Sequence, residues 1–330
     1  VENTSSPQTP SASSYSPERA VAFPPVSLAA AGWPASAVND GELSCSSGQE
    51  LFQRYCVVRS LVPEGQTALS RVYLAQHIDD PDRLVAIKIE APTHQEVPSL
   101  PGAELEAWCL ANGGGYTPKL VDTFLIDGRF PCIVMEHLPG MNGQEFMGYA
   151  REMGQNPPLS GDAQRWLARR LGSAMLHLHN LGVSLNDIKP RNVLVNGLSK
   201  GRRTRQSRAH LLDFNLARRH ERGTRANGLP QGTPRFSAPE CFGSAPFNPF
   251  LSDQFRLGAT LYALCTGAPL VQDEGSRAVQ ACIQSGAYLS SLHESTPADM
   301  SPQLVELLRR LMRPDPNDRF LDPHELRRAL

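Results

Sequence analysis

A change in hydrophobic patterning near Pro139 constrains the fold of this chain more than any other feature. Before it, short runs rich in Val, Ile, Leu and Tyr, separated by polar or Gly/Pro residues, predict strands. After it, apolar residues recur every three or four positions and predict helices. We therefore predict an α+β protein. A small antiparallel sheet with one helix, at about 50–138, precedes a larger, mainly α-helical part at about 139–330.

The individual elements follow from the same patterns. Strands are predicted at 55–58, 72–75, 84–89, 119–125 and 132–136, and helices at 103–111, 165–178, 253–265, 276–283, 303–312 and 323–330. Residues 1–45 are rich in Ser, Pro and Ala and hold too little apolar surface to offset the entropy of ordering. The prediction is a disordered tail at 1–45 followed by one folded domain at 46–330.

Net charge and hydrophobic composition limit the classes of partner that the chain is expected to bind. The chain has 32 Lys and Arg against 33 Asp and Glu, a formal charge of -1, so no overall field attracts nucleic acid. No apolar run is long enough to span a membrane. We expect protein partners, no nucleic acid, no transmembrane segment and a monomer.

The seven cysteines bear on the compartment. They contain no C-x-x-C pair, which argues against a zinc site. Cys109, Cys132 and Cys265 lie in apolar stretches and are expected to be buried. Cys45 with Cys56, or Cys241 with Cys282, are candidate disulfides if the compartment is oxidising. Spacing alone leaves these pairings open.

Residues 184–195 place a carboxylate, an ammonium and a carboxamide, those of Asp187, Lys189 and Asn192, just before an apolar run. The D-x-K-x-x-N spacing also arises by chance, so other motifs must support it. Three do, in order along the chain: Val-Ala-Ile-Lys ending at Lys88, Leu-Leu-Asp-Phe with its Asp at 213, and Ala-Pro-Glu ending at Glu240.

These ordered motifs, over residues 50–330, resemble those of protein kinases. The resemblance implies the two-lobe kinase fold, with ATP and Mg²⁺ as cofactors. Asp187 would then accept the hydrogen bond of the substrate hydroxyl, and Lys189 would steady the transferring phosphoryl group, as in the serine/threonine branch. Asn192 and Asp213 would ligate Mg²⁺.

The resemblance also implies a nucleotide site. Lys88 would hold the ATP phosphates and pair with Glu104 or Glu106, of which Glu104 is preferred. The other candidate nucleotide-binding positions are Gly65, Thr67, Ser70, Val72, Met135, Glu136 and Leu138. Two supporting contacts are implied as well: Glu240 pairs with Arg319, and Asp253 braces the catalytic loop, or else only caps a helix.

Four departures weaken the step from fold to activity. Thr67 and Ser70 replace two of the three loop glycines, so the loop would lie farther from the phosphates. Leu185 and Asn186 replace the usual His-Arg, so phosphorylation of Thr224 or Thr233 is not expected to switch activity. Asn215 replaces a glycine and is expected to tolerate left-handed backbone angles.

The fourth departure is a basic loop at 202–208 between two strands. It is either a solvated surface or a docking site for an acidic or phosphorylated partner.

Two functions therefore stay open: an Mg·ATP-dependent serine/threonine kinase with a degraded glycine loop, or a pseudokinase that acts as a binding scaffold. A kinase-like domain with these polar residues intact but a degraded glycine loop resembles the secreted apicomplexan rhoptry and dense-granule kinases, in particular the branch that lacks a glycine loop. That branch includes both active members and a bradyzoite pseudokinase. The chain begins with Val1 and carries a glycosylation sequon at Asn3, which is compatible with secretion. A cytoplasmic location is the alternative.

Overall fold

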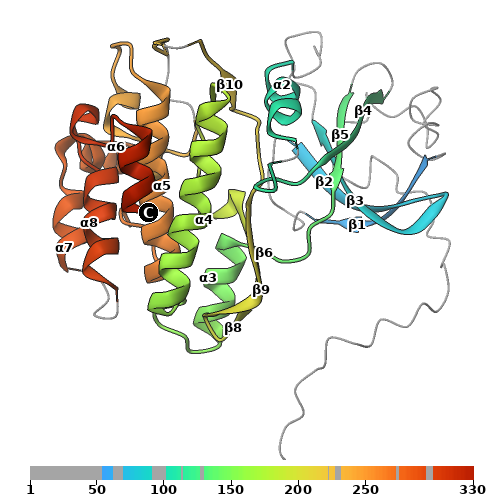
Figure 1. Cartoon of the computed structure of the whole chain (residues 1–330), viewed down its shortest axis with the longest axis horizontal. Helices are drawn as coiled ribbons and strands as arrows, with labels where there is room; N and C mark the ends of the chain where they lie inside the picture. Colours follow the sequence, from blue (N-terminus) through green and yellow to red (C-terminus); the bar gives the residue numbers. More distant parts are fainter. Residues whose placement is uncertain are drawn as a thin grey trace, which may run out of the picture. The chain divides into compact units, whose positions relative to one another are not determined.

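The computed structural model describes residues 54–61, 70–90, 102–112, 114–126, 130–221, 223–226, 232–272, 275–294 and 300–330 (Figure 1). The tail predicted at 1–45 lies outside the described residues, and so do Cys45, Gly65 and Thr67.

A five-stranded antiparallel sheet forms the first part of the described chain, in the order β1-β2-β3-β5-β4. Its strands are β1 (Tyr55–Ser60), β2 (Ser70–His77), β3 (Asp80–Glu90), β4 (Leu120–Ile126) and β5 (Phe130–Glu136). β3 is the central strand, and its residues 85–89 are all buried, which explains why every one of them except Lys88 is apolar. The predicted sheet is confirmed.

One helix accompanies the sheet, as predicted. α2 (Gly102–Ala111) buries Ala107, Trp108 and Ala111, which form one apolar stripe at helical spacing. These residues belong to the same hydrophobic core as Ile133 of β5.

The second part is mainly helical. Its helices are α3 (Gly143–Glu152), α4 (Gly161–Asn180), α5 (Pro249–Thr266), α6 (Ser276–Ser285), α7 (Tyr288–Glu294), α8 (Pro302–Leu311) and α9 (Pro323–Ala329). α4 buries Leu167, Leu171 and Leu178 along one face, and α5 is buried over almost its whole length. α5 ends at Gly267, which has a φ of 81°.

Two helices were missing from the sequence-based expectation, and two others, α4 and α5, began four residues earlier than expected. α3 starts with a capping box, in which the Asn142 side chain accepts from Glu145 N while the Glu145 carboxylate accepts from Asn142 N. α7 is short. α5 begins at Pro249 with Asn248 as its cap, so the alternative that Asp253 caps this helix was wrong.

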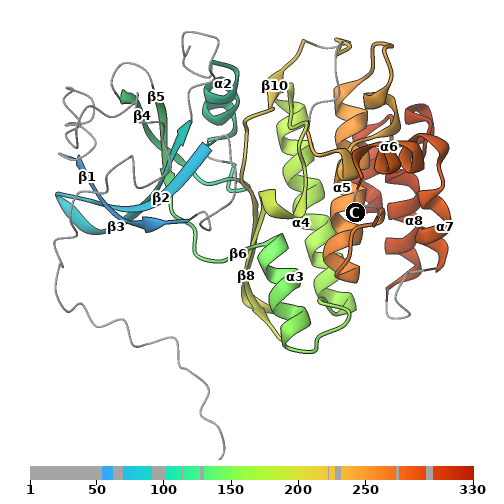
Figure 2. The same cartoon turned by 180° about the vertical axis from the view of Figure 1, so that it is seen from behind.

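Short strands complete the described structure. β6 (Met141–Asn142), β8 (Val193–Ser199) and β9 (Arg202–Leu211) form one sheet in that order, and β7 (Val183–Ser184) pairs with β10 (Arg218–Arg219). β9 lies beside α4 in both views (Figure 2). The expectation of a basic loop at 202–208 was wrong, because these residues belong to strand β9.

The cysteines differ in part from expectation. Cys132 and Cys265 are buried as predicted, whereas Cys109 is exposed, because it lies on the side of α2 away from Trp108 and Ala111. Cys241 and Cys282 do not form the disulfide considered above. Across the part of the chain that the structure describes, every helix is too short or too polar to cross a membrane.

Candidate active site

The loop that carries Asp187 runs from β7 to the short 3₁₀ turn Pro190–Asn192. The buried carboxylate of Asp253 holds it, accepting from Leu185 N at 2.7 Å and from Asn186 N at 2.8 Å. Asn186 has a φ of 62°, in the left-handed region. Asn215, which was expected only to tolerate such angles, does not adopt them: among the described non-glycine residues, positive φ occurs at Asn186 and Lys200.

Asp187 lies in a closed triangle of polar groups. Its Oδ2 accepts from Lys189 Nζ at 2.6 Å, and its Oδ1 accepts from Thr233 N at 3.0 Å and Thr233 Oγ1 at 3.1 Å. Lys189 Nζ also donates to Thr233 Oγ1 at 3.0 Å. The carboxylate is thus fixed in one orientation while its side chain stays 13% exposed, enough to meet a second molecule.

Thr233 was not among the predicted site residues. The signal for it was the preceding Gly232, which has a φ of 98° and where a Cβ would lie 2.6 Å from Asn186 O and 3.1 Å from Asp187 Oδ1. Only glycine permits this approach of two distant segments.

Asn192 lies against the same loop. Its Nδ2 donates to Asp187 O at 2.9 Å and more weakly to Asp187 Oδ2 at 3.3 Å. The amide nitrogen is therefore engaged, and Oδ1 is the atom with which Asn192 can ligate a cation.

A second group of polar side chains, apart from the Asp187 triangle, surrounds Lys88. Its side chain is 6% exposed, and Nζ donates to Glu104 Oε1 at 2.6 Å, to Asp213 Oδ1 at 2.9 Å and to Asn215 Oδ1. Burial by itself would lower the pKa of Lys88, but the carboxylates of Asp213 and Glu104 outweigh it and raise the pKa above its ordinary value. Lys88 is thus held as an ammonium.

Glu104 rather than Glu106 makes the contact with Lys88. Glu106 instead accepts from Arg219 Nη1 at 2.8 Å, and both side chains of that pair are exposed.

The Asp-Phe-Asn segment joins the two clusters. Residues Val193 and Leu211 pair in the β8–β9 ladder, and Leu212 N donates to Asn192 O at 2.9 Å. Asn192 and Asp213 therefore leave the hairpin at the same end. Phe214 is fully buried against Trp108 of α2, with ring centroids 4.6 Å apart.

The segment after Asp213 is held without the missing arginine. Asn186 Nδ2 donates to Leu216 O and to Ser184 Oγ, each at 2.9 Å, and Ser184 Oγ lies 2.8 Å from His220 Nε2. These contacts occupy the place where the expected His-Arg pair would have acted.

The other predicted positions are only partly described. Val72 pairs with Lys88 in the β2–β3 register, and Ala86 and Val85 of β3 pair with Met135 and Glu136 of β5. Leu138 is half-buried just after β5. Ser70 is the first residue of β2, and nothing further is described of its side chain.

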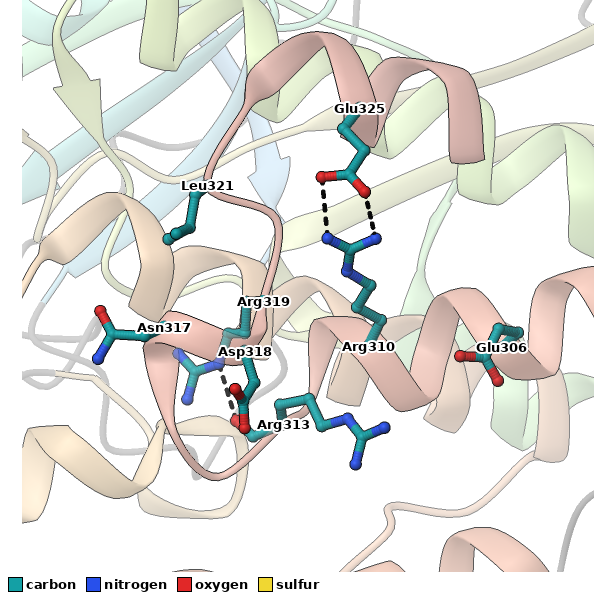
Figure 3. Close-up of a pocket in the computed structure, with 8 residues that line it drawn as sticks. All are labelled: Glu306, Arg310, Arg313, Asn317, Asp318, Arg319, Leu321 and Glu325. Carbon is teal, nitrogen blue, oxygen red and sulfur yellow. Dashed lines mark hydrogen bonds and ion pairs between the residues drawn. The ribbon is translucent and has the colours of Figure 1, made fainter.

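A hollow of about 540 Å³ lies apart from these residues, between α8 and α9 (Figure 3). Two of its three arginines are already paired: Arg310 bonds Glu325 at 2.5 and 2.8 Å, and the buried Arg319 bonds Glu240 at 2.6 and 2.9 Å. The hollow thus brings no convergent reactive groups together, whereas the Arg319 pair anchors the Ala-Pro-Glu segment.

Comparisons with known proteins agree with this geometry. The sequence model of the protein kinase domain family matches residues 61–327. The serine/threonine-protein kinase fused of Drosophila melanogaster is 27% identical over 82% of this chain, and CBL-interacting protein kinase 25 of rice (Oryza sativa subsp. japonica) is 29% identical over 58%. These alignments span only 30% and 35% of the two relatives' own lengths.

A solved structure supports the same fold. The PK-1 kinase of the Cydia pomonella granulovirus has a TM-score of 0.63 and 18% identity, covering 85% of this chain and 96% of the viral one. At that identity the likeness concerns the fold alone. Together with the family match over 61–327, it leads to one conclusion: this chain belongs to the protein kinase family.

Proposed function

We propose that this chain is a serine/threonine protein kinase that transfers the γ-phosphate of ATP to protein hydroxyl groups. One observation carries the proposal: the Asp187 triangle and the Lys88 cluster are joined through the bond from Leu212 N to Asn192 O. The groups that would contact a hydroxyl, phosphates and a cation are thereby brought together from both parts of the fold.

The residues present fit magnesium and a polyphosphate. Asn192 Oδ1 and the partly exposed carboxylate of Asp213 are hard oxygen ligands, which Mg²⁺ prefers. Lys88 supplies a charged ammonium for phosphate oxygens. When bound, Mg·ATP supplies the phosphoryl group and neutralises part of its charge.

The chain's own residues position the acceptor. Asp187 is held from two sides by Lys189 and Thr233, so its carboxylate is oriented to accept the hydrogen bond of an incoming hydroxyl. Lys189 places positive charge beside the position of that hydroxyl, where it would stabilise the negative charge on the transferring phosphoryl group. Such catalysis consists mainly of positioning and electrostatics, which this arrangement can supply.

The serine/threonine assignment rests on Lys189 and on relatives such as the kinase fused, whose name states that specificity. The segment that follows Asp213, up to the Ala-Pro-Glu motif, is held by neutral contacts of Ser184 and Asn186. We therefore propose activity that does not require phosphorylation of this segment.

Phosphate transfer tests the proposal. The wild-type chain, incubated with γ-labelled ATP, Mg²⁺ and a generic acceptor protein, should label that protein, and Asp213→Ala should abolish the labelling. Asp162→Ala is a matched control, since this aspartate is 83% exposed and far along the chain from the site. Equal labelling by the wild type and Asp213→Ala would refute the assignment.

A pseudokinase scaffold is the second candidate. The observation that favours it is the occupation of the Lys88 ammonium by three side chains, one of which, Asn215, stands where kinases have glycine. This candidate expects no labelling above Asp213→Ala and no stabilisation of the fold by Mg·ATP.

The finer placement among secreted apicomplexan kinases that lack a glycine loop is part of this proposal. Thr67 and Ser70 at two glycine positions support it, and so does the sequon at Asn3. Mass spectrometry of the native protein should find a glycan on Asn3. An unmodified Asn3 in protein isolated from its own cell would remove the sequon as support for secretion.

A further inference from the structure

The β8–β9 hairpin, whose backbone is drawn in Figures 1 and 2, carries a cluster of positive charge that takes no part in the candidate active site. Residues 193–212 contain no Asp or Glu, although the whole chain has a formal charge of -1. Their basic residues are all exposed: Lys200, Arg202, Arg203, Arg205 and Arg208. We call residues 196–208 the basic hairpin.

The backbone of the basic hairpin is fixed by inward-facing hydroxyls. The ladder pairs Asn196 with Arg208 and Leu198 with Arg203, so residues 204–207 bulge out of β9. Thr204 Oγ1 and Ser207 Oγ both donate to Gly197 O, at 2.7 and 2.8 Å. With the hydroxyls turned inward, Arg205 of the bulge is left at the surface, together with Arg203 and Arg208 on either side of it.

Gly197 makes this bulge possible. Its φ is 69°, and a Cβ there would lie 2.6 Å from Gln206 O, so a larger residue would displace the bulge. The charged surface is therefore presented on ordered backbone, which reduces the entropy lost when a partner binds.

The arginines are not neutralised within the described part of the chain. The Arg203 guanidinium lies 6.0 Å from the centre of the Trp166 ring, and Arg208 Nη1 donates to backbone carbonyls. No acidic side chain among the described residues bonds Arg202 or Arg205. The acidic residue in the first turn of α4, Asp162, is already paired with Arg165.

Protection of a sheet edge does not explain these charges. β9 is an edge strand, and edges are often guarded by charged residues. Here, however, Gly201 O already accepts from Ser160 N at 2.9 Å and Ala209 O from Arg170 Nε at 3.0 Å. The bulge between them interrupts strand pairing by itself.

We propose that the basic hairpin is a docking surface for an acidic segment of a partner protein. Guanidinium groups bind carboxylates through paired hydrogen bonds, and Arg202, Arg203 and Arg205 are placed to do so. A short acidic segment fits better than nucleic acid, because the chain as a whole is nearly neutral and gives no extended basic field. The proposal does not depend on phosphate transfer, so it can fail or succeed independently of the proposed function.

Fluorescence anisotropy of a labelled oligoglutamate peptide tests it on the full chain. A variant with Arg202→Gln, Arg203→Gln and Arg205→Gln should bind the peptide about tenfold more weakly, as expected from the loss of three exposed ion pairs. The matched control removes the same charge from exposed arginines elsewhere, Arg277→Gln, Arg327→Gln and Arg328→Gln, and should bind like the wild type. Circular dichroism of both variants checks that they fold.

Three results would overturn the proposal. One is the absence of peptide binding by the wild type, and another is equal weakening in the two triple variants, which would indicate a general charge effect. The third is tighter binding of a single-stranded oligonucleotide than of the peptide at the same salt concentration, which would assign the surface to nucleic acid.

Discussion

Asp253 offers the most quantitative check on how the catalytic loop is held. Its side chain is fully buried and accepts from Leu185 N and Asn186 N, while His179 Nε2 lies 3.1 Å from Oδ2. Asp253→Ala leaves two buried backbone N–H groups without an acceptor, each at a cost of about 1–3 kcal/mol. We expect the free energy of unfolding to fall by about 3–5 kcal/mol, a large share of the about 5–15 kcal/mol typical of domains.

Urea denaturation followed by circular dichroism measures this loss. Asp253→Asn, which keeps the volume and one acceptor oxygen, should lose about half as much. The exposed control Asp162→Ala should stay within about 0.5 kcal/mol of the wild type. A loss of less than about 1 kcal/mol for Asp253→Ala, or one equal to that of the control, would refute the reasoning.

Three further predictions follow from the site and its surroundings. Arg319→Ala leaves Glu240 without its buried partner and should lower the free energy of unfolding by about 3–5 kcal/mol in urea titrations; an unchanged midpoint would contradict it. Asn215→Gly frees the Lys88 ammonium from one acceptor and should tighten Mg·ATP binding by up to about tenfold in calorimetry, whereas weaker binding would mean that the carboxamide assists the nucleotide. Burial lowers the pKa of His210 below its ordinary 6.5, so the unfolded state takes up the proton first. Stability should thus be greatest above pH 6.5 and fall as the pH drops below it, and His210→Asn should flatten that fall; an unaltered slope would assign it to other groups.

Local spacing explains why the sequence could indicate which residues of the catalytic loop lie together. Asp187, Lys189 and Asn192 lie in one loop, so their spacing nearly determines their contacts. The strand that carries Lys88 was predictable as well, because a central strand buries residues on both faces and is apolar at almost every position.

Contacts between segments that lie far apart in the sequence were harder to predict from it. Thr233 reaches Asp187 only because the activation segment folds back at Gly232, and the Asn215 contact with Lys88 depends on the two parts of the fold meeting. The left-handed conformation of Asn186 depends on the two bonds to Asp253, which no local pattern encodes. The α3 capping box, by contrast, is a local signal that the sequence-based expectation missed: Asn142 is followed three residues later by Glu145.

Thermal melting with and without Mg·ATP tests most directly whether nucleotide is held in front of Asp187. A ligand at a hundred times its dissociation constant stabilises the folded state by about 2.7 kcal/mol. The account predicts a clear upward shift of Tm for the wild type with Mg·ATP, and its loss in Asp213→Ala or when EDTA removes the metal. A wild-type Tm that does not move at saturating Mg·ATP would contradict it.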